Sequence, residues 1–262
     1  MAKSNQANPA SLSMLLARTA AAPHTSARTL RRDAAAGHLH RVRAGVYASG
    51  AQWNAASHRR LELARIGAVV HTRRRWPVLS HESAAAVWGL ARLGPAPLVV
   101  ELADVRGTAP RSEHGVRWRR TPVDLDEVVE VNGFLVTGLV QTLVDLACSR
   151  PFLSSVIALD AGLGSILRTD AAVTACGVGR ADVFGRLDAD GRRRGTRGAQ
   201  VAIEFADGRA ESVGESLSRG QMHVLGHRDR AEQTPPGPAR GRASAARRAF
   251  RGCTPATLTG AQ

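Results

Sequence analysis

Three arginines, Arg28, Arg31 and Arg32, fall on one face of a helix predicted over Thr25–Ala36. Arg28 and Arg32 are one turn apart, and Arg31 adjoins their face. A helix of this kind can enter the ~12 Å major groove of duplex DNA, where a guanidinium reads guanine through two parallel hydrogen bonds. The alternative is a solvated basic face on a chain that uses arginine throughout. From the helix alone, this alternative is the stronger interpretation.

A small basic hairpin is predicted directly after this helix. Gly37 supplies the helix stop, and two short strands over 38–43 and 46–47 surround a turn at Gly45. A further short helix is expected before it, over Ser11–Ala22, where a serine can cap and Pro23 can end it. Two helices followed by a basic hairpin form the outline of a winged helix-turn-helix.

We expect further DNA contacts from the start of the helix and from the hairpin. Hydroxyl groups suit phosphate contacts, and the hairpin's imidazole and guanidinium groups could straddle the DNA backbone or the minor groove. The predicted DNA-binding residues are Ser26, Arg28, Thr29, Arg31, Arg32, His40, Arg41 and Arg43. Tyr47, the only tyrosine, is expected to fill the core beneath the hairpin.

Catalytic and metal-binding patterns are weak in this sequence. His81 and Glu82 resemble half of an H-E-x-x-H zinc motif, but the second histidine would fall at Ala85, so we predict no metal site. Asp145 and Asp160 lie in apolar predicted helices and suggest paired carboxylates. Without a partner lysine, histidine or metal ligand, capping or bridging of neighbouring elements is favoured. With no P-loop and no G-x-S-x-G, we predict no catalytic residue and no cofactor.

Two further basic runs are candidate phosphate contacts. They are Arg73-Arg74-Arg75 and the glycine-spaced loop Gly191–Gly198. Charge runs are usually solvated loops, and that interpretation is favoured for both. The three cysteines at 148, 176 and 253 are widely spaced and fit neither a disulfide framework nor a zinc site.

The charge of the chain favours a polyanionic partner. Its 262 residues hold 36 Lys+Arg and 22 Asp+Glu, a net charge of +14, and Lys3 is the only lysine. The 44% hydrophobic content excludes wholesale disorder. The first ten residues have no apolar run of the signal-peptide type, and the apolar stretches fall short of the ~18 residues of a membrane span. We therefore expect a soluble, cytoplasmic protein.

The middle of the chain is predicted to be α+β. Helices are expected at Arg59–His71, from Ser80 to Leu90, from Thr137 through Ala147 and from Pro151 through Leu163, with strands at Leu98–Ala103, Val116–Arg120, Val128–Val131 and Phe134–Thr137. Asn132-Gly133 between the last two strands is a strong hairpin signal. Beyond residue 177 the signal weakens, and helices are expected at Arg197–Ala206 and Gly214–Leu225. Residues 226–262, rich in Arg, Ala, Gly and Pro, are expected to be a disordered basic tail.

Several motifs in order resemble one family. They are Gly37-His-Leu-His-Arg-Val-Arg-Ala-Gly45-Val-Tyr47, Leu79-Ser-His-Glu-Ser-Ala-Ala-Ala-Val-Trp-Gly-Leu90, Val131-Asn-Gly-Phe-Leu-Val-Thr137 and Gln141-Thr-Leu-Val-Asp-Leu-Ala147. Together they are similar to AbiEi-type antitoxins of type IV toxin–antitoxin systems over about residues 11–167. The resemblance implies an N-terminal winged helix, repression of the protein's own operon, and opposition to a nucleotidyltransferase-type toxin without a tight complex.

A later segment resembles the start of a nuclease domain. Glu211-Ser-Val-Gly-Glu-Ser-Leu217 is similar to the opening of an appended domain of the very-short-patch-repair endonuclease type, with a PD-(D/E)XK active site. Such a site needs a strand-borne Asp and an acid-x-Lys to hold Mg²⁺. Only Glu215 has a counterpart, and no lysine follows Lys3. We expect a truncated or frameshifted nuclease remnant.

The sequence thus predicts a DNA-binding, antitoxin-like transcriptional regulator of α+β class. With the hairpin and the family resemblance, DNA contact by the basic helix becomes the favoured interpretation. The expected domains are a winged helix over 1–50, an α+β domain over 57–176, a linker and nuclease start over 177–225, and a tail over 226–262. Double-stranded operator DNA is the expected partner. The alternatives are an inactive DNA endonuclease of the repair type and a gene remnant without function.

Overall fold

A computed structural model of the chain describes residues 14–16, 26–107, 112, 114–120, 123–164, 167–168, 173–174 and 178–226. Side chains are described at these positions except 14–16, 167–168 and 173–174. Small sheets and many helices alternate along this part of the chain, which confirms the α+β class. The tail predicted over 226–262 lies outside the described residues from position 227 onward.

The helices are α1 (Ala27–Ala35), α2 (Gly50–Ala55), α3 (His58–Thr72), α4 (His81–Trp88), α5 (Leu139–Ser149), α6 (Phe152–Leu163), α7 (Arg180–Ala189), α8 (Thr196–Phe205) and α9 (Val213–Val224), with a 3-10 turn, η1, at Leu125–Glu127. The strands are β1 (Met14–Leu16), β2 (Leu39–Arg43), β3 (Val46–Ser49), β4 (Val100–Ala103), β5 (Val116–Arg119), β6 (Val128–Val131), β7 (Phe134–Thr137), β8 (Leu167–Arg168) and β9 (Val173–Thr174). Within the described residues, no helix is both long and apolar enough to span a membrane.

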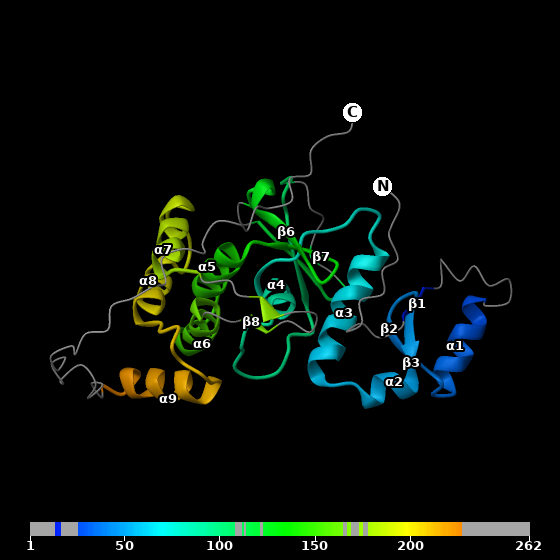
Figure 1. The fold of residues 1–262 in the computed structure, drawn as a ribbon. Helices are drawn as coiled ribbons and strands as arrows, with labels where there is room; N and C mark the ends of the chain where they lie inside the picture. Colours follow the sequence, from blue (N-terminus) through cyan, green and yellow to red (C-terminus); the bar gives the residue numbers. More distant parts are fainter. Residues whose placement is uncertain are drawn as a thin grey trace.

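The N-terminal part is a three-stranded antiparallel sheet in the order β1-β3-β2. The predicted hairpin is confirmed, because Arg41 pairs with Tyr47 and Arg43 with Val46 around a turn in which Gly45 has φ of 77°. Tyr47 is 4% exposed, as expected of a core residue. Helix α1 lies on one side of the sheet, at one end of the molecule, and α3 lies on the other side (Figure 1).

The first predicted helix is wrong. Met14–Leu16, which lie within the range Ser11–Ala22, form a strand that pairs with β3 in the register Leu15 opposite Tyr47. The competing force is tertiary, because a three-residue strand gains its hydrogen bonds only from a sheet that is distant in sequence. Local capping signals carry no information about that sheet. The sequence also predicted no helix between the hairpin and Arg59, where the structure has α2, whose first turn is capped by Ser49.

The middle of the fold joins two small sheets through a single residue. β4 pairs with β5 in parallel, and β6 pairs with β7 in the predicted Asn132-Gly133 hairpin. Leu79 bridges Leu102 of β4 and Val136 of β7, and its N–H donates to the carbonyl of Leu135 at 2.8 Å. The chain therefore enters α4 from between the two sheets, which explains why every residue of α4 is buried.

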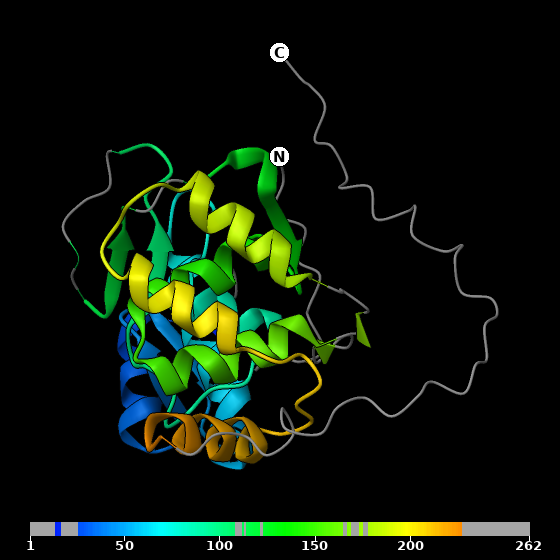
Figure 2. The ribbon, with the colours of Figure 1, turned by 90° about the vertical axis from the view of Figure 1, so that its left-hand side faces the viewer.

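The helices of the C-terminal half complete the same core. The sequence interval 177–225, expected as a linker and domain start, contains α7, α8 and α9. Val183 of α7 and Ile203 of α8 are fully buried in one hydrophobic cluster with Leu143 of α5 and Leu159 of α6. Figure 2 shows α7 and α8 lying over α5 and α6, with α9 crossing below. Among the described residues, α7 and α8 therefore share one hydrophobic core with α5 and α6.

Candidate nucleic-acid interface

One face of α1 is basic and open to solvent. Leu30 is the only buried residue of this helix, at 1% exposure, and it anchors α1 on the sheet. Arg28, Arg31 and Arg32 are all exposed. Arg32 contacts Asp33 at 3.5 Å with 78% of its side chain exposed, and no described residue pairs with Arg28 or Arg31. The structure therefore brings these three predicted residues together on the outermost helix (Figure 1).

The two predicted hydroxyl residues form the cap of α1. The N–H of Thr29 donates to Ser26 Oγ at 3.2 Å, and the two hydroxyl groups lie 3.1 Å apart. This is the usual arrangement of a serine N-cap, which satisfies one of the free N–H groups at a helix start. Ser26 is exposed and Thr29 is partly exposed.

His40 on the hairpin is held by an aromatic stack. Its ring lies 4.0 Å from the ring of Trp53 at an interplanar angle of 11°, and the guanidinium of Arg65 lies 5.5 Å from the Trp53 centroid. Partial burial, followed by the positive charge of Arg65, lowers the pKa of His40. A neutral stacked imidazole is a weak partner for phosphate. His40 thus secures β2 to α2 and α3.

Arg43 is likewise used inside the molecule. Its Nη1 donates to the carbonyl of His114 at 3.1 Å, which ties the hairpin to the start of β5. Burial, and then the charge of Arg73, lower the pKa of Arg43. Arg41 is exposed and has no partner among the described residues. Of the three predicted hairpin contacts, Arg41 is the one whose side chain is free for a phosphate.

The sequence interpretation missed Trp53 and Arg65. Trp53 lies in a polar stretch with no amphipathic pattern, so its stacking on His40 had no local signal beyond an isolated aromatic residue. Arg73, placed in a solvated run, is half-buried with its guanidinium 5.7 Å from the Trp118 centroid. Arg74 and Arg75 are exposed, as expected for that run.

A buried ion-pair cluster surrounds the start of α4. Glu101 of β4 accepts from Arg119 at 2.5 Å and from the N–H of Glu82 at 3.0 Å, so its carboxylate caps this helix in place of Ser80. Arg150 contacts Glu82 at 2.5 Å. Each acid therefore has an arginine beside it, which is the condition under which buried charge is tolerated.

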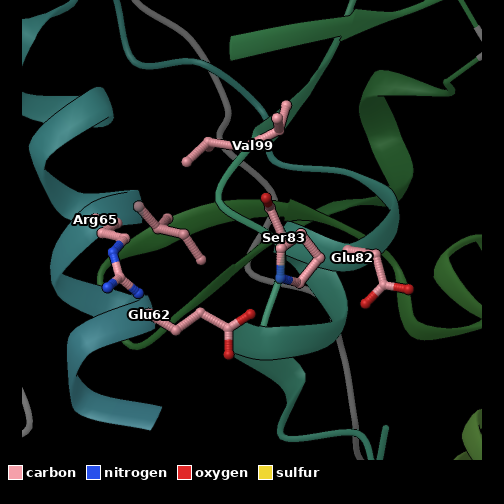
Figure 3. A pocket seen from close by; sticks show the side chains of 8 residues that line it. Glu62, Arg65, Glu82, Ser83 and Val99 are labelled. Atoms are coloured by element: carbon pink, nitrogen blue, oxygen red, sulfur yellow. The ribbon is translucent and has the colours of Figure 1, made fainter. Parts of the chain in front are cut away.

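Glu62 completes this cluster beside a very small cavity. Arg92 donates to both of its carboxylate oxygens, at 2.7 and 2.8 Å. Glu62 of α3 and Glu82 and Ser83 of α4 line the cavity, whose volume is about 10 Å³ (Figure 3). Such a volume holds at most one water molecule. The cluster positions α3, α4 and β4 and offers no room for a substrate.

His81 and Asp145 form a second buried contact. His81 Nδ1 lies 3.5 Å from Asp145 Oδ2, and Asp145 is fully buried and accepts from Gln141 and Arg193. Burial, followed by nearby arginines, lowers the pKa of His81 to about 3. Burial raises the pKa of Asp145 to about 6, against the opposing effect of Arg193. Arg193, expected in a solvated loop, is therefore a structural partner.

Asp160 and Glu215 also have structural roles. Asp160 accepts from Arg219 at 2.6 Å and from the N–H of Asp207 at 2.7 Å, which confirms the bridging predicted for Asp145 and Asp160. Glu215 accepts from the N–H of Glu211 at the exposed start of α9. Among the described residues, no three His, Cys, Asp or Glu side chains gather as a metal site.

The candidate interface consists of the exposed arginine face of α1 and the exposed Arg41 of β2, and Arg43 of the same strand ties the hairpin to the main core. Its residues all lie between positions 26 and 43 of the chain. Comparison with known proteins adds no family: no protein-family model, curated protein or solved structure matches this chain.

Proposed function

We propose that this chain is a regulator that binds duplex DNA through a winged helix-turn-helix, with α1 as the recognition helix and the β2–β3 hairpin as the wing. The observation that carries the proposal is the exposed arginine face of α1, opposite its single buried residue, Leu30. A helix anchored by one side chain at the end of the molecule can enter a major groove without a clash from the core.

The electrostatics of the chain support the same proposal. A net charge of +14 draws the protein to a polyanion and gives salt-dependent binding. The acids of the main core are largely consumed by internal pairs, as with Glu62, Glu82 and Glu101. The arginines of α1 are not, apart from the exposed Arg32–Asp33 contact.

We assign different roles to the predicted residues. Arg28 and Arg32 read base edges, because they share the face that points away from Leu30, and Arg31 adjoins them. Arg41 contacts the phosphate backbone. Ser26 and Thr29 hold the helix start at the DNA surface, while His40 and Arg43 fix the hairpin through Trp53 and His114.

The resemblance to AbiEi-type antitoxins extends the proposal to a biological setting. In that setting the DNA is the operator of the protein's own operon, and the functional counterpart is a nucleotidyltransferase-type toxin. The N-terminal part would repress transcription, and the remaining α+β core would carry the antitoxin activity. Toxicity rescue in cells that express such a toxin tests this extension separately from DNA binding.

The DNA-binding proposal predicts that arginine substitutions in α1 and in β2 weaken DNA binding in different ways. Arg28→Ala and Arg32→Ala should each weaken binding to the operator by about 1–3 kcal/mol and weaken binding to random DNA much less. Arg41→Ala should weaken binding about equally on all sequences and lower the salt slope by about one unit. Fluorescence anisotropy with DNA from upstream of the gene, at two salt concentrations, measures both effects.

Arg194→Ala is the matched control, because Arg194 is also exposed and lies in the connection between α7 and α8. Figure 1 shows these two helices at the other end of the molecule from α1. It should bind both DNAs like the parent protein. If the α1 variants lose no more affinity than Arg194→Ala, the basic face of α1 is a solvated surface and the proposal is wrong.

A further inference from the structure

A hollow lies between the end of α7 and the start of α8. Its volume is about 560 Å³, which is within the range of small-molecule sites and far above that of the cavity near Glu62. It is lined largely by the basic, glycine-spaced loop, with Arg192, Arg193, Thr196 and Arg197 supplying most of its polar side chains. The DNA-binding proposal makes no use of this loop.

The arginines of the hollow differ in what they do. Arg193 contacts Asp145 at 3.0 Å and Asp190 at 3.3 Å, so its charge is compensated and it anchors the loop to the core. Arg192 and Arg197 are exposed and have no acidic partner among the described residues. Asp188 is the one acidic residue among those that line the hollow, so the charge of Arg192 and Arg197 together exceeds the negative charge there.

The loop is held in a fixed shape around the hollow. The hydroxyl of Thr196 donates to the carbonyl of Arg193 at 2.8 Å and accepts from its N–H at 3.1 Å. Gly195 has φ of 92° and lies so close to α5 that an added Cβ would be 1.9 Å from the carbonyl oxygen of Cys148. A binding site whose backbone is already ordered loses little freedom when a ligand enters.

The hollow's chemistry favours an anion with several oxygens. Guanidinium groups match phosphate oxygens through paired hydrogen bonds. Helix α8 begins at Thr196 with Gly195 as its N-cap and no side-chain cap, and the N–H of Thr196 donates to the carbonyl of Arg193. The positive end of the helix dipole adds to the potential of the arginines. A carboxylate ligand would use the same groups less fully than a phosphate.

We propose that this hollow binds a small phosphate-bearing ligand of nucleotide size, with Arg192 and Arg197 contacting the phosphate. The site is separate from the DNA interface, because the hollow is lined by residues of α7, α8 and the connection between them, and these helices lie at the other end of the molecule from α1 (Figure 1). Failure of one proposal therefore leaves the other intact.

Isothermal titration of the full chain with pyrophosphate and with ATP, at constant ionic strength, tests the proposal. Arg197→Gln and Arg192→Gln should each weaken binding about tenfold or more, as expected for a charge-assisted contact. Arg194→Gln is the matched control: it makes the same charge change in the same loop, but Arg194 does not line the hollow. It should bind like the parent protein.

Gly198→Asp separates binding from folding. An added Cβ at Gly198 meets nothing within 4 Å, and an acid in the first turn of α8 is favourable for the helix. The variant should melt no lower than the parent protein and should lose the phosphate ligands. The charge it introduces repels an anion but leaves the loop intact.

Three results overturn the proposal. The first is that the parent protein binds neither pyrophosphate nor ATP. The second is that Arg194→Gln weakens binding as much as Arg197→Gln, which indicates general charge attraction. The third is that only binding of a non-operator DNA duplex responds to Arg192→Gln and Arg197→Gln. In that case the hollow contacts nucleic-acid backbone and not a small ligand.

Discussion

At the scale of single residues, the polar side chains divide into those consumed inside the fold and those left at the surface. Asp145 is fully buried, and its arginine partner, Arg193, lies 48 positions later in the chain. The sequence indicated bridging at Asp145 but not the partner, because contact between distant positions leaves no local pattern. The same holds for His40, whose stacking partner Trp53 belongs to another element.

His81 gives a pH-dependent prediction. It is 4% exposed, its φ is 49°, and its pKa in the folded state is lowered to about 3. The groups that face it are Asp145 and the arginines at 117, 119, 150 and 193. Because the unfolded chain binds a proton near pH 6.5 and the folded chain does not, this residue's contribution to stability is full above pH 6.5 and is lost as the pH falls toward 3.

His81→Asn removes that contribution while keeping a side chain that tolerates positive φ. From pH 7 to pH 5 the free energy of unfolding of the parent protein should fall by about 2 kcal/mol more than that of the variant. Asp145, with its raised pKa, acts in the opposite direction in both proteins. Urea denaturation at the two pH values measures the difference. His58→Asn, at an exposed histidine, should follow the parent protein, and equal slopes for all three proteins would contradict the assignment.

At the scale of elements, the sequence predicted those with strong end signals. Helices were predicted near α1 and α9, which Ser26 and Ser212 cap, and Asn132-Gly133 forms the expected β6–β7 turn. The exposed arginine face of α1 was predicted from the helical spacing of Arg28, Arg31 and Arg32. What could not be predicted are β1, which exists only through β3, and α7, whose buried residues Val183 and Leu187 have few apolar neighbours in sequence.

Two glycines at the start of α8, the N-cap Gly195 and the first-turn Gly198, should respond oppositely to alanine. Gly195→Ala places a Cβ 1.9 Å from Cys148 O at φ of 92°, so the loop must move away from α5. The variant should be destabilised by at least about 1–3 kcal/mol, the usual cost of overpacking. Gly198→Ala meets nothing within 4 Å inside α8 and should stabilise by about 0.5–1 kcal/mol. Thermal unfolding compares the two, and a similar loss in both would contradict this placement of the loop.

At the scale of the whole molecule, α7 and α8 are part of the core. Their residues Val183, Leu187 and Ile203 are buried with Leu143 and Leu159. A boundary at residue 177 looked natural in sequence because Gly, Asp and Arg become frequent there and the apolar pattern thins. The packing shows no such boundary. Two short helices with few apolar residues each can still bury those residues against α5 and α6.

Truncation tests this directly. A chain that ends at Gly164 loses α7, α8 and α9, and with them Arg193 and Arg219, the partners of the buried Asp145 and Asp160. Removing one partner of a buried ion pair costs about 3–5 kcal/mol, and two such losses are comparable to the about 5–15 kcal/mol of a whole domain. We expect this chain to show no cooperative unfolding transition by circular dichroism.

A chain that ends at Gly226 is the control, because it keeps every contact described for α7, α8 and α9. It should unfold cooperatively, close to the transition temperature of the full chain. If the chain ending at Gly164 also unfolds cooperatively near that temperature, the C-terminal helices are an accessory to an independent N-terminal core. The ion pairs Asp145–Arg193 and Asp160–Arg219 would then serve to dock those helices and would not be required for the folding of what lies beneath them.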